Sequence, residues 1–509
     1  EKQNENMLHK LNEDFESPPN AIKCNEISSP LENSDLETNR STTSPVDTED
    51  EKPVNATQLV SHDYNQNRRC YHHFFSKVHP GSVRASIFNL SILSIGTGCL
   101  SLPQRFGQMS ILLTCIEVIL GGFAAYWTLK MLIFGSLRCG EMTYSKVIQK
   151  ICGPKWGKLL DITMVIYVAG LLIIYQILVF QMIGAFVYEV GSFPEYTSLD
   201  SFYSNSLWGE MWFKIIVMIG TSLVFILPLN LLKDVTKLRF TSIFGLFCLL
   251  LVTIIIIVQL PSYLSHYYDN VYVASDPGTH INWIDAGAAF TSDLYFFKGT
   301  ATLFYAYNCH LGAFPVYEKL INNTKKRINK VLLRSIIMDS CFYVIVGVTG
   351  YLTAPINTPA FIIEREKLPG SNDLVMTISR LLIVLLLFAK IPANFNCLRI
   401  SVFELIWGDT KEISNKRNLM TTIPVTVITA LIGALYSDIG DFISLLGGFC
   451  SVIICFFFPA FIYVKCNDRP LKDKRNIATI IICGFLCVVG IIAGVLSLMT
   501  MIKSAWEDR

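Results

Sequence analysis

The sequence predicts an all-α polytopic membrane protein preceded by a tail of different composition. Of its 509 residues, 52% are hydrophobic and only 16% are charged, a balance too apolar for an ordinary soluble protein of this length. Apolar runs of about 20 residues, the length that crosses ~30 Å of hydrocarbon, recur along most of the chain. Two of these runs are interrupted near their centres. These observations favour a bundle of membrane helices arranged around two broken ones.

Residues 1 to about 75 form the predicted tail. The segment is rich in acidic residues, Asn, Ser and Thr and poor in large apolar residues, which predicts disorder. It has no apolar stretch of the kind that a signal peptide contains. We expect a cytosolic tail with a role in sorting or regulation, or an inert solvated leader.

The apolar runs predict eleven membrane spans within residues 76–509. Each run is long enough to cross the hydrocarbon layer and ends at a polar or basic loop. The spans are expected at 83–106, 109–135, 159–188, 211–230, 239–261, 292–315, 331–354, 374–398, 420–437, 443–464 and 477–502. If spans one to five and six to ten are two halves of opposite orientation, the interrupted spans open the two halves of a 5+5 inverted repeat.

Basic residues alternate between the connecting loops. Lys and Arg gather in the segments 138–158, 233–239, 319–334, 411–417 and 465–475, whereas the segments 190–210, 262–290 and 436–442 contain neither. By the positive-inside rule, the amino terminus is expected in the cytoplasm and the carboxyl terminus outside the cell or in a lumen. Arg105, Arg365 and Lys367 are exceptions to this pattern.

Glycine interrupts the first span, whose second half begins Gly96-Thr-Gly-Cys-Leu-Ser-Leu-Pro103. Glycine and proline weaken a helix, and hydrocarbon offers no water to the backbone groups that a break frees. We therefore expect the break to border a cavity, and our working hypothesis is that this cavity binds a small zwitterion.

The sixth span carries a matching interruption. Asn308 and His310 lie at its middle, and Gly312 and Pro315 follow. Corresponding interruptions in two halves point to a binding site at mid-membrane in a secondary transporter. The alternative is that the glycines of both spans only allow close helix packing and that His310 is an ordinary interior histidine.

Backbone groups of the two breaks suit a zwitterion. The amides of Gly96, Thr97, Gly98 and Cys99 would bind a carboxylate at the positive end of a half-helix. Carbonyls of residues 93–95 and of Phe304, Tyr305 and Ala306 would accept hydrogen bonds from an ammonium group. Tyr175, Tyr307, Asn308 and Asn394 are the side chains expected to line the rest of the pocket.

Ionisable residues inside predicted spans are functional candidates because charge is costly in the bilayer. We single out Glu117, His310, Asp339, Arg380 and Lys390. His310 is a candidate proton relay because its unperturbed pKa lies near neutrality, or it holds the broken helix open. Glu117 or Asp339 would suit a cationic substrate if either carboxylate faced the cavity.

Several motifs carry a family resemblance over residues 83–464, in the family's order. They are Ser86-Ile-Phe-Asn-Leu-Ser91 with Gly96-Thr-Gly-Cys-Leu-Ser-Leu-Pro103, Cys309-His310 with Pro315-Val-Tyr-Glu-Lys-Leu320, Gly350-Tyr-Leu-Thr353, Pro228-Leu-Asn-Leu-Leu-Lys-Asp234, Ser444-Leu-Leu-Gly-Gly448 and Pro459-Ala-Phe-Ile-Tyr463. As a set they resemble the amino acid/auxin permease family, within it the branch of sodium-coupled neutral and vacuolar amino acid transporters.

The resemblance implies an eleven-helix, LeuT-like inverted-repeat transporter that moves an amino acid by alternating access, driven by a sodium or proton gradient. In the sodium-coupled relatives, a cation lies between the first and eighth spans, near the segment that here reads Phe388-Ala-Lys-Ile-Pro392. The ammonium of Lys390 could stand where sodium would, which favours proton-coupled or facilitated movement, or Lys390 snorkels to the cytoplasmic interface. Asn89 fits the sodium pattern, whereas Ile92 replaces a second polar residue.

The sequence also bears on functional classes other than an amino acid transporter. A nucleotide loop, a metal motif or a nucleophile arrangement would indicate an enzyme, and we find none in the sequence. The net charge of +2 gives no reason to expect nucleic acid. The alternatives are a transporter of other small organic amines or cations and a non-transporting amino acid sensor. No cofactor is expected beyond the ion gradient, and a plasma membrane and a vacuolar or lysosomal membrane suit the charge pattern equally.

Overall fold

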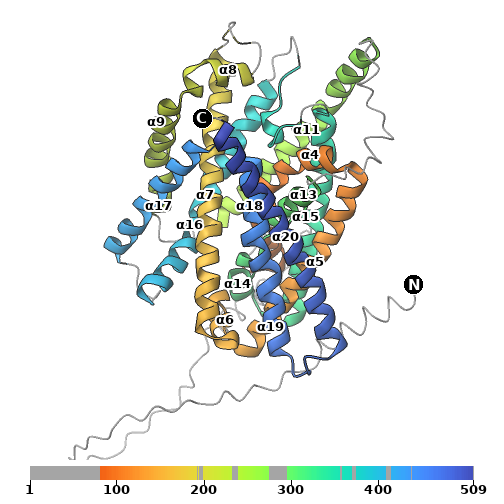
Figure 1. The fold of residues 1–509 in the computed structure, drawn as a ribbon, viewed down its shortest axis with the longest axis vertical. Helices are drawn as coiled ribbons and strands as arrows, with labels where there is room; N and C mark the ends of the chain where they lie inside the picture. Colours follow the sequence, from red (N-terminus) through yellow and green to blue (C-terminus); the bar gives the residue numbers. More distant parts are fainter. Residues whose placement is uncertain are drawn as a thin grey trace, which may run out of the picture. The chain divides into compact units, whose positions relative to one another are not determined.

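The computed structural model describes residues 81–507, except 192, 194–195, 197–198, 232–238, 274–294, 356–357, 369–373, 409–413 and 437. The predicted tail of residues 1–75 lies outside the described residues. Within the described ranges, all regular structure is helical (Figure 1). This confirms the predicted all-α class.

Chain order begins with the helices of the first half. They are α3 (Val83–Ser94), α4 (Thr97–Met109), α5 (Ile111–Cys139), α6 (Tyr144–Cys152), α7 (Pro154–Gly191), α8 (Leu199–Asn205), α9 (Met211–Thr221), α10 (Leu227–Asn230) and α11 (Arg239–Val273). A π-helical segment, Ser222–Ile226, joins α9 to α10.

The remaining helices follow residue 294. They are α13 (Tyr295–Ala306), α14 (His310–Glu318), α15 (Lys325–Thr353), α16 (Leu374–Trp407), α17 (Asn415–Leu435), α18 (Ile439–Leu446), α19 (Phe458–Cys466) and α20 (Lys474–Glu507). Two π-helical segments, Gly447–Ser451 and Ile453–Phe457, lie between α18 and α19. The π-helix is rare and is often found at functional sites.

Nine helical stretches of the described chain are long and apolar enough to cross a membrane, or ten if the bent pair α3 and α4 is one span. They overlap the predicted spans two to five and seven to eleven, and the bent pair overlaps the first. The sixth predicted span, 292–315, corresponds to α13 and α14, which do not pass the same test of length and hydropathy. The polytopic class is thus confirmed, and the count of eleven stays a prediction.

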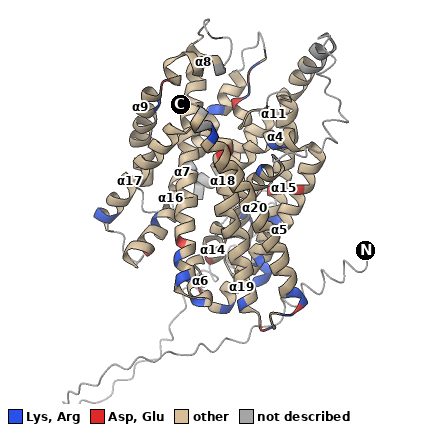
Figure 2. Ribbon diagram, viewed as in Figure 1, with Lys and Arg blue, Asp and Glu red and all other residues tan. Residues whose placement is uncertain are grey.

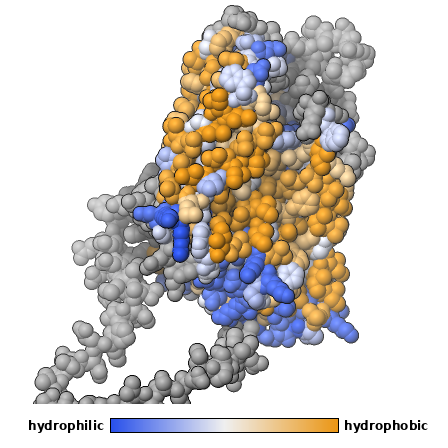
Figure 3. Space-filling view, turned by 60° about the vertical axis from the view of Figure 1, so that its left-hand side comes forward, coloured by the Kyte–Doolittle hydropathy of each residue, from blue (hydrophilic) through white to orange (hydrophobic). Residues whose placement is uncertain are grey.

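Basic side chains gather at one end of the helix bundle, around α6 and the turn between α19 and α20 (Figure 2). We call this the basic end. Beyond it, a broad apolar face rises along the bundle (Figure 3). Leu120 and Phe123 of α5 and Phe485 of α20 belong to the exposed apolar side chains. Such a surface suits contact with lipid rather than water.

The centre of the bundle is built on α7, which packs along α16. Residues 171–180 of α7 are buried without a break, so this helix is apolar on all sides and lies in the interior. Around it, α15 packs on α3 and α4, and α13 packs on α4 and α20. The two interrupted segments therefore lie inside the bundle, where backbone groups can find protein partners.

Candidate functional site

The first interruption lies between α3 and α4, which meet at an angle of 54°. Gly96 between them has φ −115° and ψ −136°, which no helix allows. Its amide donates to the carbonyl of Ser94 at 2.7 Å, so the carbonyl of Ile92 loses the donor that a continuous helix would supply. The amides of Thr97 and Gly98 open α4 and have no acceptor within their own helix.

The second interruption spans Tyr307–Cys309, between the end of α13 and the start of α14. The amide of Asn308 donates to the carbonyl of Tyr305 at 3.2 Å, one residue short of its helical partner. Phe304 therefore keeps a carbonyl without its helical donor. The amide of Cys309 turns back to the carbonyl of Tyr307 at 2.9 Å, which completes the break.

The two interruptions touch each other. A Cβ atom added to Gly98 would lie 2.9 Å from the Cα atom of Ala306. The hydroxyls of Thr97 and Tyr305 are 2.9 Å apart, and Ser94 donates to the carbonyl of Ala306 at 3.1 Å. The first turn of α4 and the last turn of α13 thus form one buried unit.

The predicted lining residues occupy different sides of this unit. Asn394 of α16 donates to the hydroxyl of Tyr175 on α7 at 3.0 Å. The hydroxyl of Tyr307 instead contacts the carbonyl of Val118 at 2.9 Å and Ser340 at 2.7 Å, toward α5 and α15. Tyr307 therefore links the second interruption to α5 and α15, whereas Tyr175 and Asn394 link α7 to α16.

Asn308 reaches the π-helical segment that follows α18. Its Nδ2 atom donates to the hydroxyl of Ser451 at 3.1 Å, while its Oδ1 atom is buried without a partner among the described residues. At Gly447, in the same π-helical segment, a side chain would collide with the carbonyl of Ala301. The π-helix thus brings its backbone close to α13 and presents Ser451 to the break.

Lys390 of α16 lies against the first interruption. Its Nζ atom donates to the carbonyl of Ile95 at 3.4 Å, and the side chain is buried. A Cβ atom at Gly96 would come within 2.7 Å of Nζ. The side chain therefore points to the break in the bundle interior rather than to an interface.

The remaining candidates for ion coupling are not gathered at one point. His310 is fully buried, and its Nε2 atom is 2.9 Å from the hydroxyl of Thr128 on α5. Glu117 of α5 accepts a hydrogen bond of 3.1 Å from Thr300 of α13. Asn89 is half-buried on α3. These contacts tie α5 to the two halves of the second interrupted segment.

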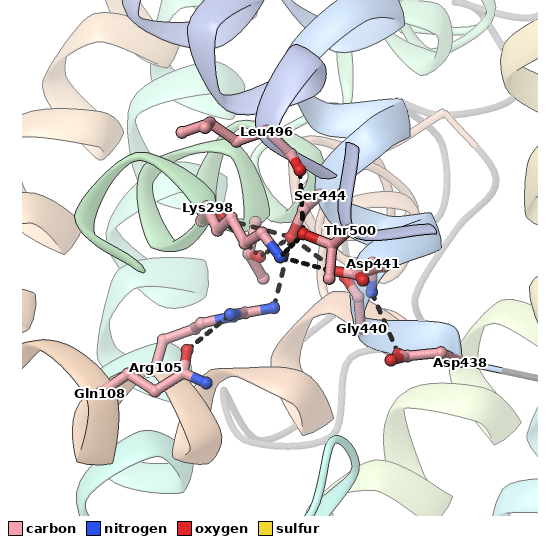
Figure 4. Close-up of polar contacts among 10 residues, drawn as sticks. Arg105, Gln108, Lys298, Asp438, Gly440, Asp441, Ser444, Leu496 and Thr500 are labelled. Atoms are coloured by element: carbon pink, nitrogen blue, oxygen red, sulfur yellow. Dashed lines mark hydrogen bonds and ion pairs between the residues drawn. The ribbon is translucent and has the colours of Figure 1, made fainter. Parts of the chain in front are cut away.

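A polar cluster joins α4, α13, α18 and α20 (Figure 4). Lys298 of α13 makes an ion pair of 2.9 Å with Asp441 of α18 and donates to Thr500 of α20 at 2.7 Å. Arg105 of α4 donates to Ser444 of α18 at 3.3 Å. Lys298 and Asp441 are both about nine-tenths buried. We call these residues the outer cluster, which fastens α4 and α13 to α18 and α20.

Sequence reasoning missed most of the outer cluster. The charge pattern marks Arg105 only as an exception, and the structure buries it. Lys298 lies inside the predicted span 292–315, so its charge was a signal that could have been used. Ser94 and Tyr167 were also missed; Tyr167 places its ring 6.2 Å from that of Tyr305. Their residue types carry no comparable signal.

Comparison with known proteins gives a family match over most of the chain. The family described as "Transmembrane amino acid transporter protein" matches residues 79–498. This range contains α3 to α19, both interruptions and the outer cluster except Thr500.

Individual relatives have low sequence identity to this chain but match most of its length. A "Sodium-coupled neutral amino acid transporter 7" of Xenopus laevis is 23% identical over 416 residues, 78% of this chain and 83% of that protein. A "Sodium-coupled neutral amino acid symporter 2" of Danio rerio is 25% identical, covering 90% of this chain and 92% of that protein. A "Putative amino acid transporter AAT1" of Plasmodium berghei (strain Anka) is 24% identical, with coverage of 84% and 72%.

Proposed function

The chain belongs to the family of transmembrane amino acid transporter proteins, and from this premise we propose that it is a secondary transporter that moves an amino acid by alternating access. In this proposal the chain has eleven spans in a 5+5 inverted repeat, with α13 and α14 as the broken sixth span. The basic end faces the cytoplasm, in a plasma membrane or a vacuolar or lysosomal membrane.

The observation that carries the proposal is the contact between the two interruptions. Thr97 and Gly98 offer amides at the start of α4, where the helix dipole favours a carboxylate. The carbonyls of Ile92 and Phe304 have lost their helical donors and suit an ammonium group. Backbone donors for a carboxylate and backbone acceptors for an ammonium group thus lie in the two interruptions that contact each other.

One carbonyl that the sequence predicts as an acceptor for the ammonium group, that of Ala306, already accepts hydrogen bonds from the protein. The carbonyl of Ala306 accepts from Ser94 at 3.1 Å and from Tyr343 at 2.6 Å, which occupies both of its lone pairs. Substrate binding through Ala306 would have to displace one of these hydroxyls. We therefore assign the ammonium group first to Phe304.

Lys390 supports coupling to protons, or facilitated movement, rather than coupling to sodium. Its amino group donates to the carbonyl of Ile95 and, when protonated, places a positive charge there. A sodium ion beside it would meet a like charge in a medium of low dielectric constant, where repulsion is strong. Relatives at 23–25% identity are named sodium-coupled, so the ion is the point at which we expect this chain to differ.

Transport by the purified protein in proteoliposomes tests the proposal. We expect counterflow of at least one amino acid from a panel that also contains small amines, and stimulation of uptake by an inward proton gradient. Replacing sodium with choline should leave uptake unchanged. Exchange of amines alone would favour the amine transporter, and binding without flux would favour the sensor. Loss of most uptake in choline contradicts the coupling that we propose.

A further inference from the structure

Asp339 is a buried carboxylate with no assigned role. It lies on α15, is 0% exposed, and neither of its oxygen atoms has a hydrogen-bond partner among the described residues. An unpaired negative charge in such a place is strongly unfavourable. The group must therefore gain a positive charge, and the smallest is a proton.

The serine hydroxyl groups beside Asp339 already donate to backbone carbonyls. Ser91 and Ser94 of α3 both lie beside the carboxyl group. Ser91 donates to the carbonyl of Ser335 at 3.4 Å, and Ser94 donates to the carbonyl of Ala306 at 3.1 Å. A hydroxyl has one proton to donate, so neither can serve the carboxylate while these bonds last.

Charged and titratable groups surround Asp339 from several elements. Lys390 approaches from α16, Cys99 from α4, Cys309 from the second interruption, and Tyr307 and Tyr343 from the same interruption and from α15. Lys390 is the one cation among them, and its Nζ atom donates to the carbonyl of Ile95. It forms no ion pair with Asp339 in the described residues.

We propose that Asp339 binds and releases the transported proton, and that Ser94 transmits its protonation state to the carbonyl of Ala306. The inference deepens the proposed function and rests on it. With Asp339 neutral, Ser94 donates to Ala306, as observed. With Asp339 charged, the carboxylate attracts the Ser94 hydroxyl proton because hydrogen bonds to charged acceptors are stronger. Ala306 then loses the hydrogen bond that joins it to α3, the two interruptions are held together less firmly, and the substrate between them is released. Protonation of Asp339 thus favours substrate binding, as uptake with a proton requires.

Tyr343 completes the path between the proton site and the interruption. It follows Asp339 by four residues on α15, so both side chains lie on one helix face. Its hydroxyl is 3.0 Å from Ser94 and donates to the carbonyl of Ala306 at 2.6 Å. Ser94 can turn toward Asp339 without leaving Ala306 unpaired, since Tyr343 remains bonded to it.

Concentrative uptake tests the proposal. With the membrane potential clamped at zero, a gradient of one pH unit can drive about tenfold accumulation through one proton per substrate. We expect this of the unaltered protein and of Asp468→Asn, an acid-to-amide control in an exposed loop. Asp339→Asn keeps the shape of the side chain but cannot release a proton. It should retain counterflow and accumulate nothing beyond equilibrium.

Infrared difference spectra give a measurement that does not need transport. Lowering the pH should produce the carbonyl band of a protonated carboxylic acid in the unaltered protein and in Ser94→Ala, but not in Asp339→Asn. Ser94→Ala should nevertheless lose most pH-driven accumulation. Thermal unfolding of each variant checks that it is folded. If Asp339→Asn does not fold, Asp339→Glu is the substitute variant, because it keeps an acid at this position.

Different failures have different meanings. The same band in Asp339→Asn as in the unaltered protein, or tenfold accumulation by that variant, overturns the proton site. Accumulation driven by sodium and lost in Asp339→Asn means that the site binds sodium instead. Absence of amino acid flux in the unaltered protein refutes the proposed function, while the infrared band still decides whether Asp339 takes a proton.

Discussion

Gly98 and Ala306 lie in direct contact across the two interrupted segments. A Cβ atom at position 98 would come within 2.9 Å of the Ala306 Cα atom and 3.0 Å of its Cβ atom. The first turn of α4 can approach α13 this closely only because residue 98 has no side chain. Both readings of the glycine, close packing and access to its amide, meet at this contact.

Gly98→Val should abolish substrate binding while leaving membrane insertion intact. The added methyl groups force α4 away from α13 and displace the amides of Thr97 and Gly98, at an overpacking cost of about 1–3 kcal/mol. Gly484→Ala on α20 is the control, because a Cβ atom there meets nothing within 4 Å. Binding by scintillation proximity and thermal unfolding are to be measured on both. If Gly98→Val binds substrate normally, the first interruption serves packing and the site lies elsewhere.

Lys390→Ala should change the ion requirement of transport. Removing the ammonium group leaves the carbonyl of Ile95 without its cationic donor, and an external cation can then take its place. We expect uptake by this variant to rise with sodium, whereas uptake by the unaltered protein should not. Lys472→Ala alters an exposed lysine at the basic end and should behave like the unaltered protein. An ion dependence identical in all three proteins removes Lys390 from the coupling site.

The ion pair of Lys298 and Asp441 should be strongly coupled. Replacing one partner leaves the other charge buried, which costs about 3–5 kcal/mol, whereas replacing both costs much less. Lys298→Met should therefore lower the melting temperature more than Lys298→Met combined with Asp441→Leu. Lys150→Met breaks a pair of 3.5 Å whose side chains are 44% and 35% exposed, and it should cost at most about 1 kcal/mol. Additive effects of the two buried substitutions would show that the pair does not hold the outer cluster.

His310→Gln should retain pH-driven uptake. The Nε2 atom of His310 contacts Thr128, which fastens the start of α14 to α5. The loss should be that of one buried hydrogen bond, about 0.5–1.5 kcal/mol of stability. Thr128→Val should destabilise the protein to a similar extent, and the double variant should show that the two effects are not additive. Uptake by His310→Gln that no longer responds to pH would restore the histidine as the proton relay.

The membrane class and the position of the first interruption were accessible from the sequence. Long apolar runs mark helices because a bilayer has a fixed thickness, and the predicted spans overlap the nine long helices of the described chain. Glycine and proline mark where a helix weakens, and Gly96 stands between α3 and α4. These properties are local, since each depends on the composition of one segment.

The partners of the buried charged groups could be identified only from the tertiary structure. Helical periodicity assigns Asp339, Lys390 and Lys298 to helix faces, but it does not say which distant helix each face meets. The fold places Lys390 at Ile95, Asp339 beside Ser94, and Lys298 at Asp441, across separations of up to 295 residues. It also turns Tyr307 toward Val118 and Ser340.

The sequence alone determined where membrane helices form and where the first one breaks, because those depend on neighbouring residues. Only the packing of the helices against one another decided which polar groups meet, because contact between distant segments is a property of the whole bundle.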